Sequence, residues 1–179
     1  MKNIKFSLLS IKTKDLKKEE ILSICKLKNT YWPWTITKQL EWYKKTAKKT
    51  DINNMLLINN KLVGYTLLRK RKAIKNNKSF IYYYLDSFIL HKKFRNKGVG
   101  EILILFNNKI LAKLKPHSFL TCLKKTIPFY LKYNWKILPK NRFKIMDHKP
   151  AWFKSISSVN GMTYNLDKRV KKKILYSFN

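Results

Sequence analysis

A glycine-rich turn between a strand and a helix is the stretch of this sequence best suited to bind an anion. Residues 80–90 are mostly aromatic and aliphatic, as in a strand, and apolar residues at helical spacing begin at Val99. Between them, Lys97-Gly98-Val99-Gly100 holds two of the four glycines of the chain. Backbone N–H groups at a helix N-terminus bind anions, and glycine lets the ligand approach the backbone closely. The pattern therefore predicts an anion site at this turn.

A lone carboxylate lies within the strand that leads to the turn. Asp86 is the only acidic residue from position 52 to position 100. Unless a bulge intervenes, strand alternation places it on one face with three aromatic residues, Tyr82, Tyr84 and Phe88. Apolar neighbours raise the pKa of a carboxyl group and make it a better base, whereas nearby lysines lower it. Asp86 is therefore either a proton acceptor at a functional site or the partner of one of the many lysines.

Short strands and amphipathic helices are expected around these residues. Alternating or continuous short apolar runs predict strands at 4–8, 55–58, 62–68, 80–90, 118–123, 135–138 and 162–166. Apolar residues three or four apart predict a helix capped by Asp15 and ending near Lys28, one over 36–47, and a short one over 126–133. A further helix after the glycines is expected to bury six residues: Val99, Ile102, Leu103, Phe106, Ile110 and Leu114. Residues 59–61 are expected to form a hairpin turn, and residues 70–78 a basic connection. This order predicts one α/β domain around a mixed sheet.

The chain is strongly basic. It has 179 residues, with 41 Lys and Arg against 9 Asp and Glu, and a formal net charge of +32. Such a charge favours anionic ligands, nucleic acid or acidic membrane surfaces. Genome composition is the alternative explanation, because Lys, Asn and Ile have AT-rich codons. A hydrophobic fraction of 45% indicates a globular protein, and no apolar run approaches the ~20 residues of a membrane span.

The cysteines and histidines give no sign of a metal site. Cys25 and Cys122 fall in apolar-periodic segments, as reduced thiols of a cytoplasmic protein do, so we expect a cytoplasmic location. The three histidines, His91, His117 and His148, lack ligand spacing, so no metal is expected. The oligomeric state stays open between monomer and homodimer.

Two motifs resemble those of the GNAT acyl-CoA N-acyltransferases. Arg95-Asn96-Lys97-Gly98-Val99-Gly100 matches the pattern R/Q-x-x-G-x-G/A. Residues 129–135, FYLKYNW, look like the family signature F-Y-x-K-x-G-F, with Asn134 in place of Gly and Trp135 in place of Phe. The resemblance runs from about residue 55 to 135. It implies a mixed, mostly antiparallel central sheet flanked by helices in a single domain over 1–179, with the cofactor core at about 55–135 and a basic tail at 168–179.

The resemblance also implies acetyl-CoA as the acyl donor. Backbone groups from Asn96 to Glu101 would hold its pyrophosphate, including those of Lys97, Gly98, Val99 and Gly100. Arg95 and Lys97 would add charge near the phosphates. The pantetheine arm would pair like an added strand with Phe88, Ile89 and Leu90. The sequence departs from the family at Leu123, where members often have an Asn that contacts CoA.

By the same resemblance, Asp86 and Tyr130 are the predicted catalytic residues. Asp86 lies nine residues before Arg95, the spacing of a Glu in spermidine/spermine and aminoglycoside 2′-N-acetyltransferases. It would take a proton from the acceptor amine, directly or through a water, while the amine attacks the thioester in a ternary complex. A backbone N–H near Ile89 would polarise the thioester carbonyl. Tyr130 would protonate the departing thiolate.

A small-molecule primary amine is the expected acceptor. Trp32, Trp34, Tyr84 and Trp152 are the predicted acceptor-binding residues, because the resemblance implies that the segments holding the tryptophans border the acceptor. Aromatic faces stack on sugars and nucleobases, but they also form plain core corners, so both interpretations stay open. The net charge favours an amino sugar, particularly one linked to a nucleotide, or a protein amine in an anionic setting, over a polycation. The alternative from another class is a GNAT-like module that binds RNA, the ribosome or an anionic surface without turnover. Nucleic acid binding follows from the charge alone and is not the favoured interpretation.

Overall fold

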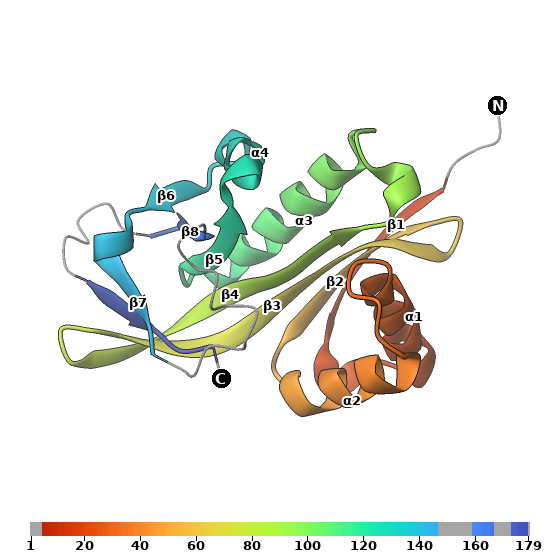
Figure 1. Ribbon diagram of the computed structural model, residues 1–179, viewed down its shortest axis with the longest axis horizontal. Helices are drawn as coiled ribbons and strands as arrows, with labels where there is room; N and C mark the ends of the chain where they lie inside the picture. The colour runs from red at the N-terminus through yellow and green to blue at the C-terminus, as the bar shows by residue number, and fades with distance from the viewer. Residues whose placement is uncertain (1–4, 147–158, 167–172, 179) are drawn as a thin grey trace. The chain divides into compact units, whose positions relative to one another are not determined.

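The computed structural model describes residues 5–146, 159–166 and 173–178 (Figure 1). The chain forms two compact units. The first unit comprises Met1–Arg69 and Leu85–Ile110, and the second comprises Lys70–Tyr84 and Leu111–Asn179. Strands β3 (Lys61–Lys75) and β4 (Lys78–Leu90) contribute residues to both units.

Antiparallel strands form the sheet of the first unit. Strand β1 (Phe6–Lys12) pairs with β2 (Ile52–Ile58), β2 pairs with β3, and β3 neighbours β4. Asn59 and Asn60, with φ of 49° and 62°, form the turn between β2 and β3. Two consecutive positive φ values are typical of a two-residue hairpin turn, so the hairpin predicted from these asparagines is confirmed.

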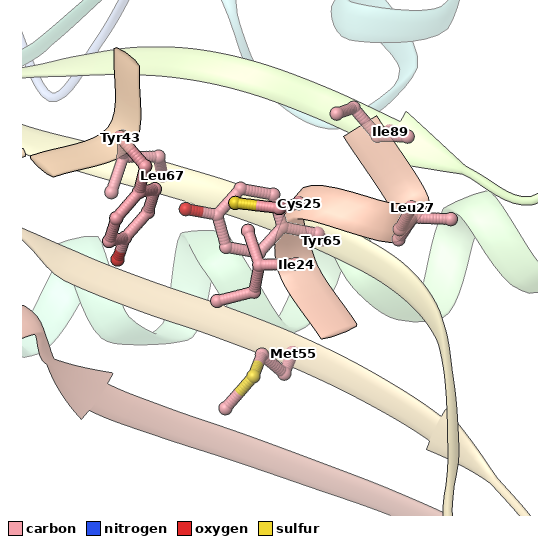
Figure 2. Packing of buried hydrophobic residues seen from close by; sticks show 8 residues of the cluster. All are labelled: Ile24, Cys25, Leu27, Tyr43, Met55, Tyr65, Leu67 and Ile89. Carbon is pink, nitrogen blue, oxygen red and sulfur yellow. The ribbon is translucent and has the colours of Figure 1, made fainter. Parts of the chain in front are cut away.

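Helices α1 (Lys18–Asn29) and α2 (Ile36–Thr46) cover one face of this sheet. Helix α1 begins where the backbone N–H of Lys17 donates to the carboxylate of Glu20 at 2.7 Å. The predicted cap at Asp15 is wrong, because Asp15 belongs to a preceding 3₁₀ turn, Thr13–Asp15. Helix α2 confirms the helix predicted over 36–47 to within one residue, and the Thr35 side chain caps it by accepting from the Lys38 N–H. Figure 2 shows the core beneath these helices: Ile24, Cys25, Leu27, Tyr43, Met55, Tyr65, Leu67 and Ile89.

Helix α3 (Val99–Leu114) packs on the opposite face of the first unit's sheet. Its residues Val99 and Leu103 join a cluster with Leu56, whereas Met55, the preceding residue in β2, belongs to the α1–α2 core. A Cβ on Gly64 would lie 3.1 Å from the Leu103 side chain, so the helix packs closely on β3.

The buried face of α3 differs from the predicted one. Of the predicted residues, Ile102, Phe106, Ile110 and Leu114 are only partly buried. The fully buried positions include Ile104, Asn107 and Leu111. The oxygen of the Asn107 side chain accepts hydrogen bonds from Asn54 and Thr66, both at 3.0 Å. A buried amide with partners on the sheet rotates the apolar stripe away from the one that hydrophobicity alone predicts.

The second unit is built on short strands and stacked aromatic rings. Strand β5 (Ser118–Leu123) pairs in parallel with β4 and antiparallel with β8 (Val159–Tyr164), which also pairs with β6 (Lys136–Leu138). Helix α4 (Ile127–Lys132) follows a 3₁₀ turn, Lys124–Thr126, and confirms the predicted short helix. The core includes Ala73, Tyr82, Tyr84, Phe119, Leu138, Ile174 and Tyr176.

Three features of the second unit were not predicted. The basic stretch 70–78 is not a loose connection, because β3 continues to Lys75 and Asn76 and Asn77, both with positive φ, turn the chain into β4. Strand β7 (Phe143–Ile145) pairs in parallel with β9 (Ile174–Tyr176), which pairs with β3. Three-residue strands carry too few residues for an alternation to be visible in the sequence.

Over the described residues, the architecture is mixed α/β with four α-helices and a mostly antiparallel sheet. The predicted fold class is therefore confirmed. In the part of the chain that the structure describes, no helix combines the length and apolar character needed to cross a membrane.

Candidate functional site

The turn before α3 is exposed and has the backbone conformation that its glycine allows. Residues 95–98 are exposed and Val99, the first residue of α3, is buried. Gly98 has φ +73°, while a Cβ there would meet nothing within 4 Å. Glycine is therefore favoured at this position by the positive φ and not by crowding. The first N–H groups of an α-helix have no acceptor within the helix, so this turn presents donors to an anion.

The edge of β4 beside the turn is held by Tyr31, from the α1–α2 loop. The Tyr31 hydroxyl donates to the Leu90 carbonyl at 3.1 Å, and the Leu90 N–H lies 3.5 Å from the same hydroxyl. Arg95 Nε also donates to the Leu90 carbonyl, at 3.2 Å, and its guanidinium lies 4.3 Å from the centre of the Tyr31 ring. A ligand that pairs with the backbone of Leu90 therefore has to displace the Tyr31 hydroxyl.

Asp86 is paired with an arginine in the first unit. Its side chain is 22% exposed, and Oδ2 lies 3.5 Å from Nη1 of Arg69. Arg69 is itself fixed, because Nη2 donates to the Thr46 carbonyl at 2.8 Å and Nε lies 4.0 Å from the buried carboxylate of Asp51. The salt-bridge alternative for Asp86 thus holds, with an arginine as the partner in place of a lysine.

A bulge at Ser87 interrupts strand β4. Ser87 has φ +56°, in the left-handed region, and its hydroxyl donates to Asp86 Oδ1 at 3.1 Å. Phe88 packs against the cluster on the α3 side, and Ile89 belongs to the core beneath α1 and α2. Asp86 contacts Arg69. Arg69 lies two and four residues after Leu67 and Tyr65 in β3 and so shares their face of the sheet, the α1–α2 side. The predicted shared face of Asp86 and Phe88 is therefore wrong, because the bulge reverses the alternation.

Lys28 is a buried cation beside Asp86, and no role for it was predicted from the sequence. It is 4% exposed, and its Nζ lies 3.5 Å from the Ser87 hydroxyl. The same Nζ lies 3.7 Å from the centre of the Trp42 ring and 5.5 Å from that of Trp32. Burial lowers the pKa of Lys28 to about 8, although the Asp86 charge opposes the change. The sequence pattern that could have indicated its burial is its position on the apolar side of α1, with Ile24 and Cys25.

The predicted acceptor-binding residues do not all lie in the same unit or have the same exposure. Trp32 and Trp34, in the α1–α2 loop, are 45% and 48% exposed, and Trp32 lies above Lys28. Tyr84 belongs to the second unit, where it is buried, stacks on Phe178 and has its hydroxyl 3.1 Å from Thr121 Oγ1. Trp152 lies outside the described residues. Of the four residues, Trp32 is thus connected to Asp86, because Lys28 lies near the Trp32 ring and contacts Ser87, which contacts Asp86.

Tyr130 lies in α4 of the second unit. It is buried, with its ring edge-on to Phe129 at a centroid distance of 5.3 Å. Burial raises the pKa of the phenol well above its ordinary value, so Tyr130 holds its proton at any ordinary working pH. Leu123, where the GNAT family often has Asn, is largely exposed. Within the described ranges, no three His, Cys, Asp or Glu side chains gather as a metal site.

Comparisons with known proteins bear on this arrangement. The sequence matches the Acetyltransferase (GNAT) family model over residues 19–134, which is more than half of the chain. No curated protein sequence matches the chain. An acyl-CoA N-acyltransferase from Pseudomonas aeruginosa has a similar structure, with TM-score 0.66 and 11% identity over 89% of this chain and 99% of that one.

Two further similar structures come from Escherichia coli and Arabidopsis thaliana. The Escherichia coli ribosomal-protein-S18-alanine N-acetyltransferase has TM-score 0.61 and 11% identity, with 92% of this chain and 97% of that chain covered. Arabidopsis thaliana Naa50, in complex with the bisubstrate analogue CoA-Ac-MVNAL, has TM-score 0.60 and 15% identity, with 90% and 99% covered. At such identities these likenesses concern the fold.

The mixed sheet, the exposed turn at the start of α3 and the family match together define an acyltransferase. The chain belongs to the GNAT family of acetyltransferases, as its two motifs led us to expect. It is accordingly an N-acetyltransferase.

Proposed function

We propose that this protein transfers the acetyl group of acetyl-CoA to a primary amine, which attacks the thioester directly in a ternary complex. One observation carries this proposal: the strand that ends at the exposed turn also holds Asp86, on the α1–α2 side of the first unit's sheet. Arg69 and Ser87 hold that carboxylate in place. A fixed base and an anion-binding turn on one continuous segment are what such a transfer needs.

The turn is the proposed donor site. Backbone groups from Asn96 to Glu101 hold the pyrophosphate of acetyl-CoA, and Arg95 and Lys97 add positive charge. The pantetheine arm pairs with the backbone of Phe88, Ile89 and Leu90. Gly98→Glu places a carboxylate at the turn, so we expect loss of acetyl-CoA binding by calorimetry. Unchanged binding in this variant, or no acetyl-CoA binding by the wild-type protein, overturns the proposal.

Asp86 and Tyr130 are proposed for separate proton transfers. Asp86 accepts a proton from the acceptor ammonium, because only the neutral amine attacks the carbonyl carbon. The C–N bond then forms as the C–S bond breaks, with the carbonyl polarised by a backbone N–H near Ile89. Tyr130 gives its proton to the departing CoA thiolate and regains one from the nitrogen of the forming amide, which loses its second proton, or from solvent.

Tyr130→Phe tests the second of these roles. Because the phenol is the proposed acid, we expect kcat to fall by about 10²-fold while the acetyl-CoA Kd stays the same. The raised pKa of Tyr130 also predicts that wild-type kcat does not fall through ionisation of this phenol as the pH rises past 10, its ordinary value. Initial rates of thiol release and a CoA titration measure both quantities. Wild-type kcat in the variant contradicts the assignment.

An amino sugar, in particular one linked to a nucleotide, is the proposed acceptor. The exposed rings of Trp32 and Trp34 offer stacking faces in the α1–α2 loop, and Trp32 lies near Lys28, which contacts Ser87. The net charge of +32 attracts a nucleotide carrier and repels a polycation. A protein amine in an anionic setting is the second candidate, favoured by the structural similarity to the S18-alanine acetyltransferase and Naa50.

An acceptor screen tests the proposal directly. Acetyl-CoA is incubated with glucosamine, a nucleotide-linked glucosamine, alanine-ended peptides and polyamines, and free thiol is measured. We expect the fastest thiol release with the nucleotide-linked sugar, followed by the peptides. Release without an amine, or a polyamine preferred by a wide kcat/KM margin, contradicts the proposal. Strongly salt-dependent RNA binding without turnover supports the rival binding module instead.

A cytoplasmic location remains a prediction.

A further inference from the structure

We propose that Ser87 and Lys28 extend Asp86 into a proton relay, in which Lys28 is a positioning residue that receives the acceptor's proton through Ser87 and Asp86. The inference rests on the proposed function, because Asp86 is the group that meets the amine. It goes beyond that function because it assigns the proton's destination to a side chain from α1.

The relay is a continuous chain of polar contacts within the first unit. The Ser87 hydroxyl donates to Asp86 Oδ1 at 3.1 Å, and Lys28 Nζ donates to the Ser87 hydroxyl at 3.5 Å. Asp86 is partly exposed at one end, and Lys28 is buried at the other. A proton taken up at the carboxylate can therefore pass inward by reversal of two hydrogen bonds.

The surroundings of Lys28 keep it ready to accept a proton. The Trp42 ring lies against its Nζ, and the Ser87 hydroxyl is its hydrogen-bond partner among the residues that the structure describes. The charged or titratable groups that act on it are Asp86 on β4 and Cys25 on α1, which raise its pKa, and Arg69 on β3, which lowers it. Desolvation, the largest effect, acts in the same direction as Arg69 and outweighs Asp86 and Cys25, so the neutral form of Lys28 is accessible near pH 8. Arg69 contacts Asp86, donates to the Thr46 carbonyl and has its Nε 4.0 Å from Asp51. A guanidinium group has no acceptor atom, so we assign it no part in the relay.

The backbone at Ser87 supports the assignment. A serine at φ +56° inside a strand is uncommon, and such strained residues cluster at functional sites. This conformation places the hydroxyl against Asp86 and within reach of Lys28. A regular strand would turn residue 87 to the opposite face of the sheet from Asp86.

The proton balance of the relay closes without a further reactant. The acceptor ammonium gives one proton to Asp86, Asp86 passes a proton to Ser87, and Ser87 passes its own to the neutral Lys28 amine. The neutral acceptor then attacks the thioester, and its second proton leaves with the CoA thiol. Lys28 finally returns its proton to solvent. The sum is ammonium and acetyl-CoA giving amide, CoA thiol and one proton.

A lysine Nζ titration by NMR on the full chain tests the coupling without any acceptor. We expect one lysine with a midpoint near pH 8, absent in Lys28→Met and present in Lys26→Met, a variant of an exposed lysine on the same helix. In Asp86→Asn this midpoint falls further, because the carboxylate that raises it is gone. A Lys28 signal that titrates with the ordinary lysines, or is insensitive to Asp86→Asn, overturns the relay.

The pH profile of kcat tests the relay in turnover. The acceptor is the nucleotide-linked glucosamine or the alanine-ended peptide, whichever reacts faster. Wild-type kcat is expected to rise through a midpoint near pH 8. Lys28→Arg keeps a cation beside Trp42 that does not titrate in this range, so we expect a drop of at least about tenfold and loss of that rise. Ser87→Gly removes the hydroxyl while allowing the positive φ. We expect the same fall in kcat and the same loss of the rise near pH 8 as in Lys28→Arg.

The outcomes separate the relay from the proposed function. If Asp86→Asn keeps wild-type turnover, the proposed base is wrong. If Asp86→Asn is inactive but Lys28→Arg and Ser87→Gly keep the wild-type kcat and its rise near pH 8, only the relay is overturned. Lys26→Met serves as the control, and its profile is expected to match the wild type.

Discussion

Two cations of different character act on Asp86. Arg69 is fixed by its hydrogen bond to the Thr46 carbonyl, and its planar guanidinium holds the carboxylate in one orientation. Lys28 is buried against Trp42, and its pKa lies near the physiological range. The charge of Lys28 can therefore change at moderately alkaline pH, while the contacts of Arg69 hold Asp86 in place.

The buried charge of Lys28 has a cost in stability that depends on pH. Its pKa is about 8 in the folded protein against 10.5 as the ordinary value, which corresponds to about 3 kcal/mol. Below pH 8 both states are protonated, and the cost is fully present. Between pH 8 and 10.5 the unfolded chain binds the extra proton, so this group makes stability rise with pH.

Lys28→Met should therefore be at least as stable as the wild type at about pH 7, with the lost Trp42 contact offsetting about 1 kcal/mol of the gain. Because the cost disappears at higher pH, this advantage of the variant should shrink by about pH 10. Urea unfolding of both proteins at the two pH values measures the difference. A variant advantage that does not change with pH contradicts the buried-cation account.

At the scale of elements, the α1–α2 loop and the edge of β4 are linked by Tyr31. The hydroxyl of this one side chain contacts both backbone groups of Leu90, where the pantetheine arm is proposed to pair. The same loop carries Trp32 and Trp34. Binding of the donor would therefore release a loop that we assign to the acceptor.

Tyr31→Phe should tighten acetyl-CoA binding. The variant lacks the hydroxyl that competes for Leu90, and one lost neutral hydrogen bond of about 1 kcal/mol corresponds to about fivefold in Kd. Calorimetric titration of acetyl-CoA into both proteins measures this change. Trp34→Phe, in the same loop, is the control and should leave Kd unchanged. Weaker binding by Tyr31→Phe would show that the hydroxyl assists the donor.

The elements that the sequence predicts well are those with long, regular patterns or strong turn residues. The strand at 118–123, the hairpin at Asn59 and Asn60 and the helix after the glycines follow from local pattern alone. Strands β7 and β9 are paired by distant segments and are too short to show a period. The face of α3 depends on Asn107, whose burial is set by Asn54 and Thr66 on the sheet.

The candidate site divides in the same way. The turn and Asp86 are visible in sequence because glycines and an isolated carboxylate stand out against their surroundings. Lys28 is one of many lysines, and only the packing of Trp42 and Ser87 distinguishes it. The bulge at Ser87 leaves no local signal either, since serine has no preference for positive φ.

At the scale of the whole molecule, net charge should govern which acceptors reach the site. At +32 the protein attracts anionic carriers over distances that salt shortens to about 8–10 Å. Raising salt from about 0.05 to 0.5 M should lower kcat/KM severalfold for a nucleotide-linked amine and leave a neutral-carrier amine nearly unchanged. Steady-state rates with the two acceptors measure this. Equal salt dependence would indicate that the charge reflects genome composition.

The pairing of a donor turn with a base nine residues upstream is tested most directly by Asp86→Asn. One preparation is used for both acetyl-CoA binding by calorimetry and kcat by thiol release, beside the wild type. Because Asp86 is proposed to act on the amine and not on the donor, we predict an unchanged acetyl-CoA Kd and a kcat reduced by about 10²-fold or more. Wild-type kcat, or loss of acetyl-CoA binding in a folded variant, would contradict the account.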